Sequence, residues 1–220
     1  MSKWIDKDYI VNYGKIAGVD EAGRGPLAGP VVAAAVFLDE EQEKDLLLNI
    51  PFIDDSKKLN ERLRVEIWKY VKIKRIPHAI GLSNETMIDQ YNILVSTNMA
   101  MNSALKNLKV TYNMAIIDGK NLTINYPNKQ IVKGDSCSLR IALASNIAKV
   151  VRDNIMRGYS RKYPEFSFEK NKGYGTRVHL QAIDSYGPTP FHRLTFRPLI
   201  EIVTENKLKQ TKRMASIRPD

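Results

Sequence analysis

The chain has 220 residues, enough to bury a sizeable core, and no stretch rich in Pro, Gly or Ser divides it into two units. Lys and Arg number 34 against 24 Asp and Glu, and the net charge of +10 favours a polyanionic partner, although a merely soluble basic protein has the same balance. The single cysteine, Cys137, excludes an internal disulfide and a cysteine-based zinc site, and no segment approaches the roughly 20 apolar residues that span a bilayer.

Two apolar runs near the N-terminus, residues 15–20 and 31–38, are separated by a Gly/Pro turn, a pattern typical of paired strands. Asp20 and Glu21 lie where the first run ends. Because side chains alternate along a strand, both carboxylates can reach one metal centre only if the strand breaks there. The residues 22–23, Ala-Gly, offer that break, so we predict a strand that ends at the acidic pair.

A helix and a strand are predicted next. Asn60 is a residue type that commonly caps helices. Leu63, Ile67 and Val71 follow it at intervals of four positions, which predicts an amphipathic helix. Residues 76–82 then have the pattern of a strand.

The middle of the chain has one further helix and one buried strand. Apolar positions over residues 93–108 predict the helix. Residues 114–117 form a short apolar run that leads directly into Asp118 and Gly119. We therefore expect Asp118 at the end of a strand, where a turn begins.

The last third of the chain is mostly helical by its pattern. The clearest helix covers residues 138–157, with one apolar stripe and Gly158 expected to end it. Thr176 is expected to begin a second helix that ends near Gly187, and residues 198–209 a third. Strands first, and mixed strands and helices later, fit an α/β fold in which a sheet is layered with helices.

Four acids, Asp20, Glu21, Asp118 and Asp135, lie at predicted strand ends or just before a predicted helix. Phosphodiester hydrolysis needs an activated water, a stabilised leaving oxygen and neutralised phosphate charge, and two hard cations about 4 Å apart on oxygen ligands supply all three. Each acid also has a structural alternative. The first two could be turn residues, Asp118 part of an Asp-Gly turn, and Asp135 a helix cap.

Several blocks of the chain, in this order, resemble the type 2 ribonucleases H, the ribonuclease HII family. They are GVDEAGRGPLAGP at 18–30, DSKKL at 55–59, DG at 118–119, KGDS at 133–136, NKGYGT at 171–176 and YGPTP at 186–190. The resemblance covers roughly residues 15 to 198. It implies the ribonuclease H-like fold, a mixed central sheet flanked by helices with a small helical C-terminal part.

The resemblance also implies residue roles. Asp20, Glu21, Asp118 and Asp135 would be the catalytic acids and the ligands of divalent metal ions, Mg²⁺ or Mn²⁺. The substrate contacts would be Gly23, Arg24 and Gly25 at the 2′-hydroxyl and its phosphate, Tyr174 on the adjacent sugar, and Lys57 and Lys58 on phosphates. Each has an alternative, since Arg24 could be a surface cation, the lysines a solvated loop, and the Tyr174 segment an ordinary loop before a helix.

The function implied is a metal-dependent endonuclease. It would cleave the RNA strand of RNA/DNA hybrids and cut 5′ to ribonucleotides embedded in duplex DNA, leaving 3′-hydroxyl and 5′-phosphate ends. Ribonuclease HIII is the nearest rival, but its extra N-terminal domain does not fit the 19 residues that precede Asp20. A hybrid-binding module without catalysis is the rival from another class, and four intact acids argue against it because clustered negative charge does not help a protein to bind phosphates.

The remaining expectations concern organisation. We expect a catalytic domain over residues 1–198 and a basic appendage over 199–220, in a protein that acts as a monomer. A cytoplasmic location is expected because the first residues lack the apolar core of a signal peptide. Arg140 and Asn146 depart from the alanine-rich helix turn expected after the fourth acid. His192 and Arg193 are assigned a structural role.

Overall fold

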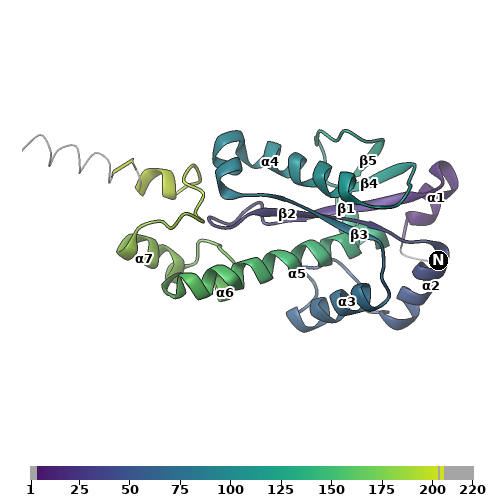
Figure 1. Cartoon of the computed structure of the whole chain (residues 1–220), viewed down its shortest axis with the longest axis horizontal. Helices are drawn as coiled ribbons and strands as arrows, with labels where there is room; N and C mark the ends of the chain where they lie inside the picture. Colours follow the sequence, from purple (N-terminus) through teal and green to yellow (C-terminus); the bar gives the residue numbers. More distant parts are fainter. Residues whose placement is uncertain (1–3, 203, 206–220) are drawn as a thin grey trace, which may run out of the picture.

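The computed structural model describes residues 4–202 and 204–205. Its centre is a five-stranded mixed sheet in the order β3-β2-β1-β4-β5 (Figure 1). The strands are β1 (Ile16–Ala22), β2 (Val31–Phe37), β3 (His78–Ser83), β4 (Met114–Asp118) and β5 (Asn128–Ile131). The first three are antiparallel neighbours, whereas β4 is parallel to β1 and β5 is parallel to β4. This is the mixed sheet that the resemblance implied.

Helices cover both faces of the sheet (Figure 1). They are α1 (Asp6–Tyr13), α2 (Glu40–Asn49), α3 (Glu61–Ile73), α4 (Glu85–Asn107), α5 (Leu139–Lys162), α6 (Phe168–Asn171) and α7 (Arg177–Tyr186). Two short 3₁₀ helices, η1 (Gly134–Ser136) and η2 (Pro164–Phe166), precede α5 and α6. The sheet therefore lies between α4 on one face and α5 with α3 on the other.

The period-two alternation of the strands explains these layers. In β2, Ala33 and Ala35 pack with Ala100 and Ala104 of α4, while Ala34 belongs to the cluster on the opposite face that includes α3 and α5. Small residues let the helices approach closely. At Gly81, for example, a Cβ would lie 1.9 Å from the carbonyl oxygen of Ala100.

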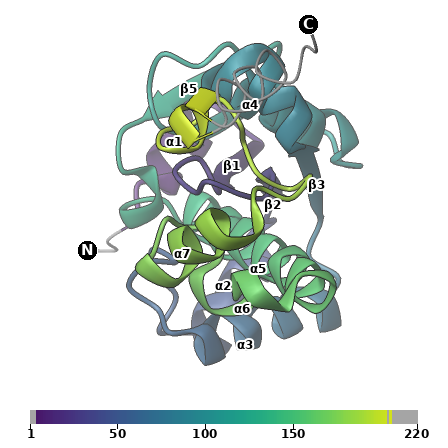
Figure 2. The ribbon, with the colours of Figure 1, turned by 90° about the vertical axis from the view of Figure 1, so that its left-hand side faces the viewer.

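The C-terminal half of α5 extends beyond the sheet and forms the centre of a smaller packed unit with α6 and α7 (Figures 1 and 2). Its core includes Met156, Phe166 and Phe168, all buried. Leu199 is also fully buried in this cluster, so packing continues past residue 198. Residues 199–202 and 204–205 are helical, and the rest of the helix predicted over 198–209 lies outside the described residues.

The predicted strands and the helices that begin after Asn60 and Thr176 are confirmed, and both capping side chains accept a hydrogen bond from the third residue of their helix. The break expected at residues 22–23 is confirmed, because β1 ends at Ala22 and Gly23 has a φ of +99°. One expectation was wrong. Gly158 does not end its helix, which runs on to Lys162, because this glycine does not adopt the left-handed conformation that ends a helix.

The helix predicted over 93–108 starts earlier, at Glu85. A kink at Asn92, with a φ of 69°, interrupts it, and this break in the periodicity explains why the sequence pattern showed only the second part. Helices α1 and α2 and strand β5 were not predicted, because their short segments carry little apolar periodicity.

Candidate active site

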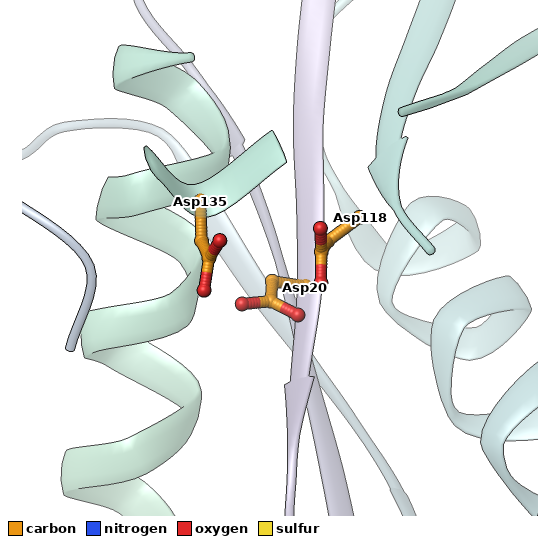
Figure 3. Close-up of side chains that lie close together, drawn as sticks. All are labelled: Asp20, Asp118 and Asp135. Carbon is orange, nitrogen blue, oxygen red and sulfur yellow. The ribbon is translucent and has the colours of Figure 1, made fainter. Parts of the chain in front are cut away.

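Three of the four predicted acids meet at one point (Figure 3). Strands β1 and β4 are parallel neighbours with Val19 opposite Ile117, so the next residues, Asp20 and Asp118, lie side by side. Asp135 reaches them from η1, just before α5. Each of these three residues offers a carboxylate oxygen, and these oxygens all lie within 4.8 Å of one another. We call these three residues the aspartate cluster.

The backbone around the cluster fixes its members. The Oδ1 of Asp118 accepts a 2.7 Å hydrogen bond from the backbone N–H of Gly134, which ties the end of β4 to η1. Gly119 has a φ of +115°, so the chain turns at Asp118-Gly119 as the structural alternative required. Asp118 nevertheless also belongs to the aspartate cluster, so both interpretations of this residue hold. Asp135 does not cap α5, because Ser138 occupies that position and accepts a hydrogen bond from Ile141.

Burial and like charge dominate the electrostatics of the cluster. Burial raises the pKa of Asp20 well above its usual value, and the charges of Glu21 and Asp118 raise it further. Burial also raises the pKa of Asp135, with Asp118 and Asp55 adding to the effect. Such a group of oxygen donors, with unfavourable mutual repulsion and no soft ligand, fits a hard divalent cation such as Mg²⁺ or Mn²⁺.

Glu21 lies beside the cluster and is not one of its three members. Its carboxylate Oε1 is 3.5 Å from Nη1 of Arg24, and its backbone N–H donates a 2.6 Å hydrogen bond to Oδ1 of Asp20. Burial raises the pKa of Glu21, Arg24 opposes that rise, and Asp118 adds to it. Strand alternation directs the side chain of Glu21 away from that of Asp20. Glu21 is still near enough to Asp118 for the charge of Asp118 to raise its pKa.

The two predicted lysines lie differently. Nζ of Lys57 is 3.7 Å from Oδ2 of Asp135, so this exposed side chain reaches the cluster. Lys58 instead forms an ion pair with Asp54 at 3.2 Å. Asp55, which was not among the predicted site residues, acts on Asp135 through its charge and a side-chain hydrogen bond. Its position in the block DSKKL was the only sequence signal for it.

The two loops predicted to contact substrate are adjacent in space. A Cβ built on Gly25 would lie 3.7 Å from Cε1 of Tyr174, and the Tyr174 side chain is about half exposed, at 51%. The backbone N–H of Leu27 donates a 2.8 Å hydrogen bond to the carbonyl of Gly173, which joins the two loops directly. The Gly23–Gly25 segment also follows β1, the strand that carries Asp20.

Comparisons with known proteins agree with this geometry. The family model described as Ribonuclease HII matches residues 17–198. The chain belongs to the ribonuclease HII family. A Thermotoga maritima ribonuclease HII is 45% identical over 210 residues, covering 94% of this chain and 83% of the relative. A Bacillus subtilis ribonuclease HII is 46% identical over 184 residues, covering 84% and 70%.

A solved structure shows the same fold. The crystal structure of ribonuclease H2 from Pyrococcus horikoshii OT3 has a TM-score of 0.70 and 25% identity, and the match covers 88% of this chain and 99% of that one. Membership makes the protein a hydrolase, an endoribonuclease with ribonuclease H activity on RNA/DNA hybrids that depends on divalent metal ions. Within the described residues, no helix has the length and apolar character needed to cross a membrane.

Two buried arginines bind the backbone of residues 23–30, which we call the glycine-rich loop. Arg193 donates hydrogen bonds to the carbonyls of Gly23, Arg24 and Gly29. Arg152, on α5, donates to the carbonyls of Ala28 and Pro30 and to that of Lys172 in the Tyr174 loop. Sequence reasoning missed Arg152, because a single arginine in a long helix carries no signal of burial.

The departures from the expected helix turn have structural explanations. Arg140 is buried, and its Nη1 contacts Asp6 at 3.1 Å and Glu43 at 2.9 Å, which links α5 to α1 and α2. Nδ2 of Asn146 donates to the backbone carbonyl of Asp54. This contact places the start of the DSKKL block against α5, near the aspartate cluster.

Proposed function

We propose that this ribonuclease HII cuts 5′ to a single ribonucleotide embedded in duplex DNA, as well as within RNA strands of hybrids, and leaves 3′-hydroxyl and 5′-phosphate ends. The observation that supports this most is the adjacency of three parts. The Gly23–Gly25 loop directly follows the strand of Asp20, and Tyr174 packs beside Gly25. One ribonucleotide can therefore be read beside the place where its phosphodiester is cut.

The acids are proposed as the metal site. Asp20, Asp118 and Asp135 would hold Mg²⁺ or Mn²⁺, with Glu21 contributing from the edge of the cluster. When bound, such a cation makes a water more acidic and offsets the negative charge of the phosphate. The Gly134 N–H holds the Asp118 carboxylate in place before any ion binds, which reduces the reorganisation that binding requires.

The substrate contacts are proposed from the same geometry. Backbone groups of Gly23, Arg24 and Gly25 would sense the 2′-hydroxyl, since glycine leaves room for a ribose to approach and the hydroxyl both donates and accepts. Tyr174 would pack on the adjacent sugar with its half-exposed ring. Lys57 and Lys58 would contact phosphates, and Lys57 lies nearer the cluster.

We also propose that residues 1–198 act as the catalytic domain and 199–220 as a basic appendage, in a cytoplasmic monomer. The family match over 17–198 and the basic residues Lys207, Lys209, Lys212 and Arg213 support this division. The appendage begins at Leu199, which is buried against the unit formed by α5, α6 and α7.

The test is cleavage of a labelled DNA duplex that contains one ribonucleotide, with the product ends mapped, in Mg²⁺, in Mn²⁺ and with chelator. We expect metal-dependent cleavage on the 5′ side of the ribonucleotide and a 5′-phosphate on the downstream product. Asp20→Asn is the control for contaminating nucleases. Cleavage of continuous hybrids without cleavage of this duplex would overturn the proposal and leave the family activity intact.

A further inference from the structure

Two histidines outside the proposed active site form a buried pair. His179 lies on α7 and His192 in the segment that follows it, and their exposed fractions are 0% and 2%. Their Nε2 atoms are 2.9 Å apart, a hydrogen-bond distance. Phe166 packs against the ring of His192 and Phe168 against that of His179, which surrounds the pair with apolar surface. We call these two residues the histidine pair.

The hydrogen bonds of the pair have one consistent direction. The backbone N–H of Thr189 can only donate, so the Nδ1 of His192, 2.8 Å away, must accept. His192 then carries its proton on Nε2 and donates to Nε2 of His179. His179 in turn carries its proton on Nδ1, which donates to the backbone carbonyl of Tyr174 at 2.8 Å. Both rings are neutral in this arrangement.

Burial favours the same neutral state. It lowers the pKa of His179, and burial together with the neighbouring ring lowers the pKa of His192 to about 4. An added proton on either ring would face another N–H group and break the chain of hydrogen bonds. The pair is therefore a fixed connection from Thr189 to Tyr174 at neutral pH.

The segment that carries His192 also contacts the glycine-rich loop. The backbone N–H of Gly29 donates to the carbonyl of Phe191 at 2.9 Å, and that of Arg193 donates to the carbonyl of Leu27 at 2.8 Å. His192 forms an isolated bridge with Ala28 between these two bonds. Residues 189–193 thus contact both proposed substrate loops, one through the backbone and the other through the histidine pair.

We propose that His179 and His192 are positioning residues that set Tyr174 against the Gly23–Gly25 loop and thereby determine the preference for a single embedded ribonucleotide. The carbonyl of Tyr174 also accepts from Thr176, but that contact lies within its own loop. Among the described residues, the hydrogen bond from His179 is the one that ties this carbonyl to the segment 189–193, whereas the contacts of Leu27 and Arg152 join the neighbouring residues Gly173 and Lys172 to the glycine-rich loop. This inference rests on the proposed role of Tyr174.

The test uses two near-isosteric variants of His179. The amide of His179→Asn can take the place of Nδ1 and still donate to Tyr174, whereas that of His179→Gln can take the place of Nε2 and contacts only His192. For each we would measure kcat and KM on a duplex with one ribonucleotide and on a continuous hybrid, together with Tm. We expect His179→Gln to lower the ratio of the two efficiencies about tenfold, as loss of one buried hydrogen bond predicts, and His179→Asn to change it less than about twofold.

A merely structural role would lower Tm or activity on both substrates and leave the ratio unchanged, which would overturn the proposal. Two further variants, Tyr174→Ala and Tyr174→Ala/His179→Gln, distinguish a failure of the positioning role of the histidine pair from a failure of the proposed role of Tyr174. If Tyr174→Ala lowers the ratio, the double variant should lower it no further. If Tyr174→Ala leaves the ratio unchanged, the role of Tyr174 itself is wrong. If it lowers the ratio and His179→Gln does not, the histidine pair has no positioning role.

Discussion

Asp20 is buried with like charges around it, so its charged form is unfavourable until a cation binds. We expect Asp20→Asn to stabilise the metal-free protein by about 1 kcal/mol, because the substitution removes a buried charge and keeps the shape. The cleavage rate of the same variant should fall more than about 100-fold. Removing a residue that only supports a metal ligand already costs up to about 100-fold, and Asp20 is proposed as a ligand itself.

The measurement is thermal unfolding of wild type and Asp20→Asn with chelator and with Mg²⁺, beside the cleavage rate. Mg²⁺ should raise the Tm of wild type and have little effect on the variant. A variant that is less stable than wild type in chelator would contradict this account of the Asp20 electrostatics.

His192 provides a prediction about pH. Burial and His179 lower its pKa from 6.5 to about 4, so the unfolded chain binds a proton that the folded chain excludes. Its contribution to stability is therefore fully present above about pH 6.5 and is lost as the pH falls toward 4. The loss amounts to on the order of 3 kcal/mol.

Denaturant unfolding of metal-free wild type and His192→Gln between about pH 7 and pH 4.5 measures this contribution. Asp20 and Asp135, whose pKa values are raised, act in the opposite direction but equally in both proteins. Wild type should lose more stability than the variant over this range. Parallel pH profiles would show that His192 does not titrate as described.

At the scale of elements, strand ends were predictable and their pairing was not. The apolar runs before Asp20 and Asp118 indicated two strands that end in acids, but no local pattern states that these strands are parallel neighbours in this register. The break expected at residues 22–23 is present, since β1 ends at Ala22, but it does not bring Glu21 into the aspartate cluster. The family motifs identified Asp118 and Asp135 as site residues. Local sequence patterns alone fitted a turn residue and a helix cap equally well.

Arg152 and the histidine pair show what sequence reasoning could not find. Their roles depend on contacts between segments far apart in the chain, such as Arg152 with the carbonyl of Pro30. Arg193 was assigned a structural role, and the structure adds that its partners are the carbonyls of the glycine-rich loop. Long-range hydrogen bonds of this kind leave no periodic pattern in the sequence.

The glycine-rich loop gives a prediction at this scale. Gly23 has a φ of +99°, and a Cβ there would lie 2.1 Å from Nε of Arg152. We expect Gly23→Ala to lower the free energy of unfolding by about 2 to 4 kcal/mol through strain and overpacking, and to damage cleavage of both substrates. Chemical denaturation and cleavage assays on the two duplexes check it.

Gly25→Ala is the matched control. The nearest atom to its added methyl group is Cε1 of Tyr174 at 3.7 Å, an ordinary contact. Stability should stay within about 0.5 kcal/mol of wild type, while substrate contact at this loop is impaired. Equal stability losses at the two glycines would show that the loop is not held by Arg152 as described.

At the scale of the whole molecule, the net charge of +10 predicts substrate affinity that falls steeply as salt rises. Lys57→Ala and Lys58→Ala should each flatten the dependence of binding on salt by roughly one counterion if both contact phosphates. Lys57→Ala should also reduce the cleavage rate more than Lys58→Ala, because Lys57 reaches Asp135 whereas Lys58 is paired with Asp54.

Binding to a labelled hybrid at several salt concentrations, with cleavage measured in parallel, tests both statements. An unchanged slope for one variant would assign that lysine to the solvated surface. A larger loss of cleavage in Lys58→Ala than in Lys57→Ala would contradict the distances of the two side chains from the aspartate cluster.

The central claim is that the aspartate cluster performs metal-dependent cleavage while the basic surface holds the substrate. It is tested most directly by measuring binding and cleavage of one labelled RNA/DNA hybrid by Asp118→Asn in Mg²⁺. The account predicts hybrid binding within a few-fold of wild type and cleavage reduced by more than about 100-fold, because the substitution removes a metal ligand and leaves the basic surface unchanged. Turnover near the wild-type rate would contradict it.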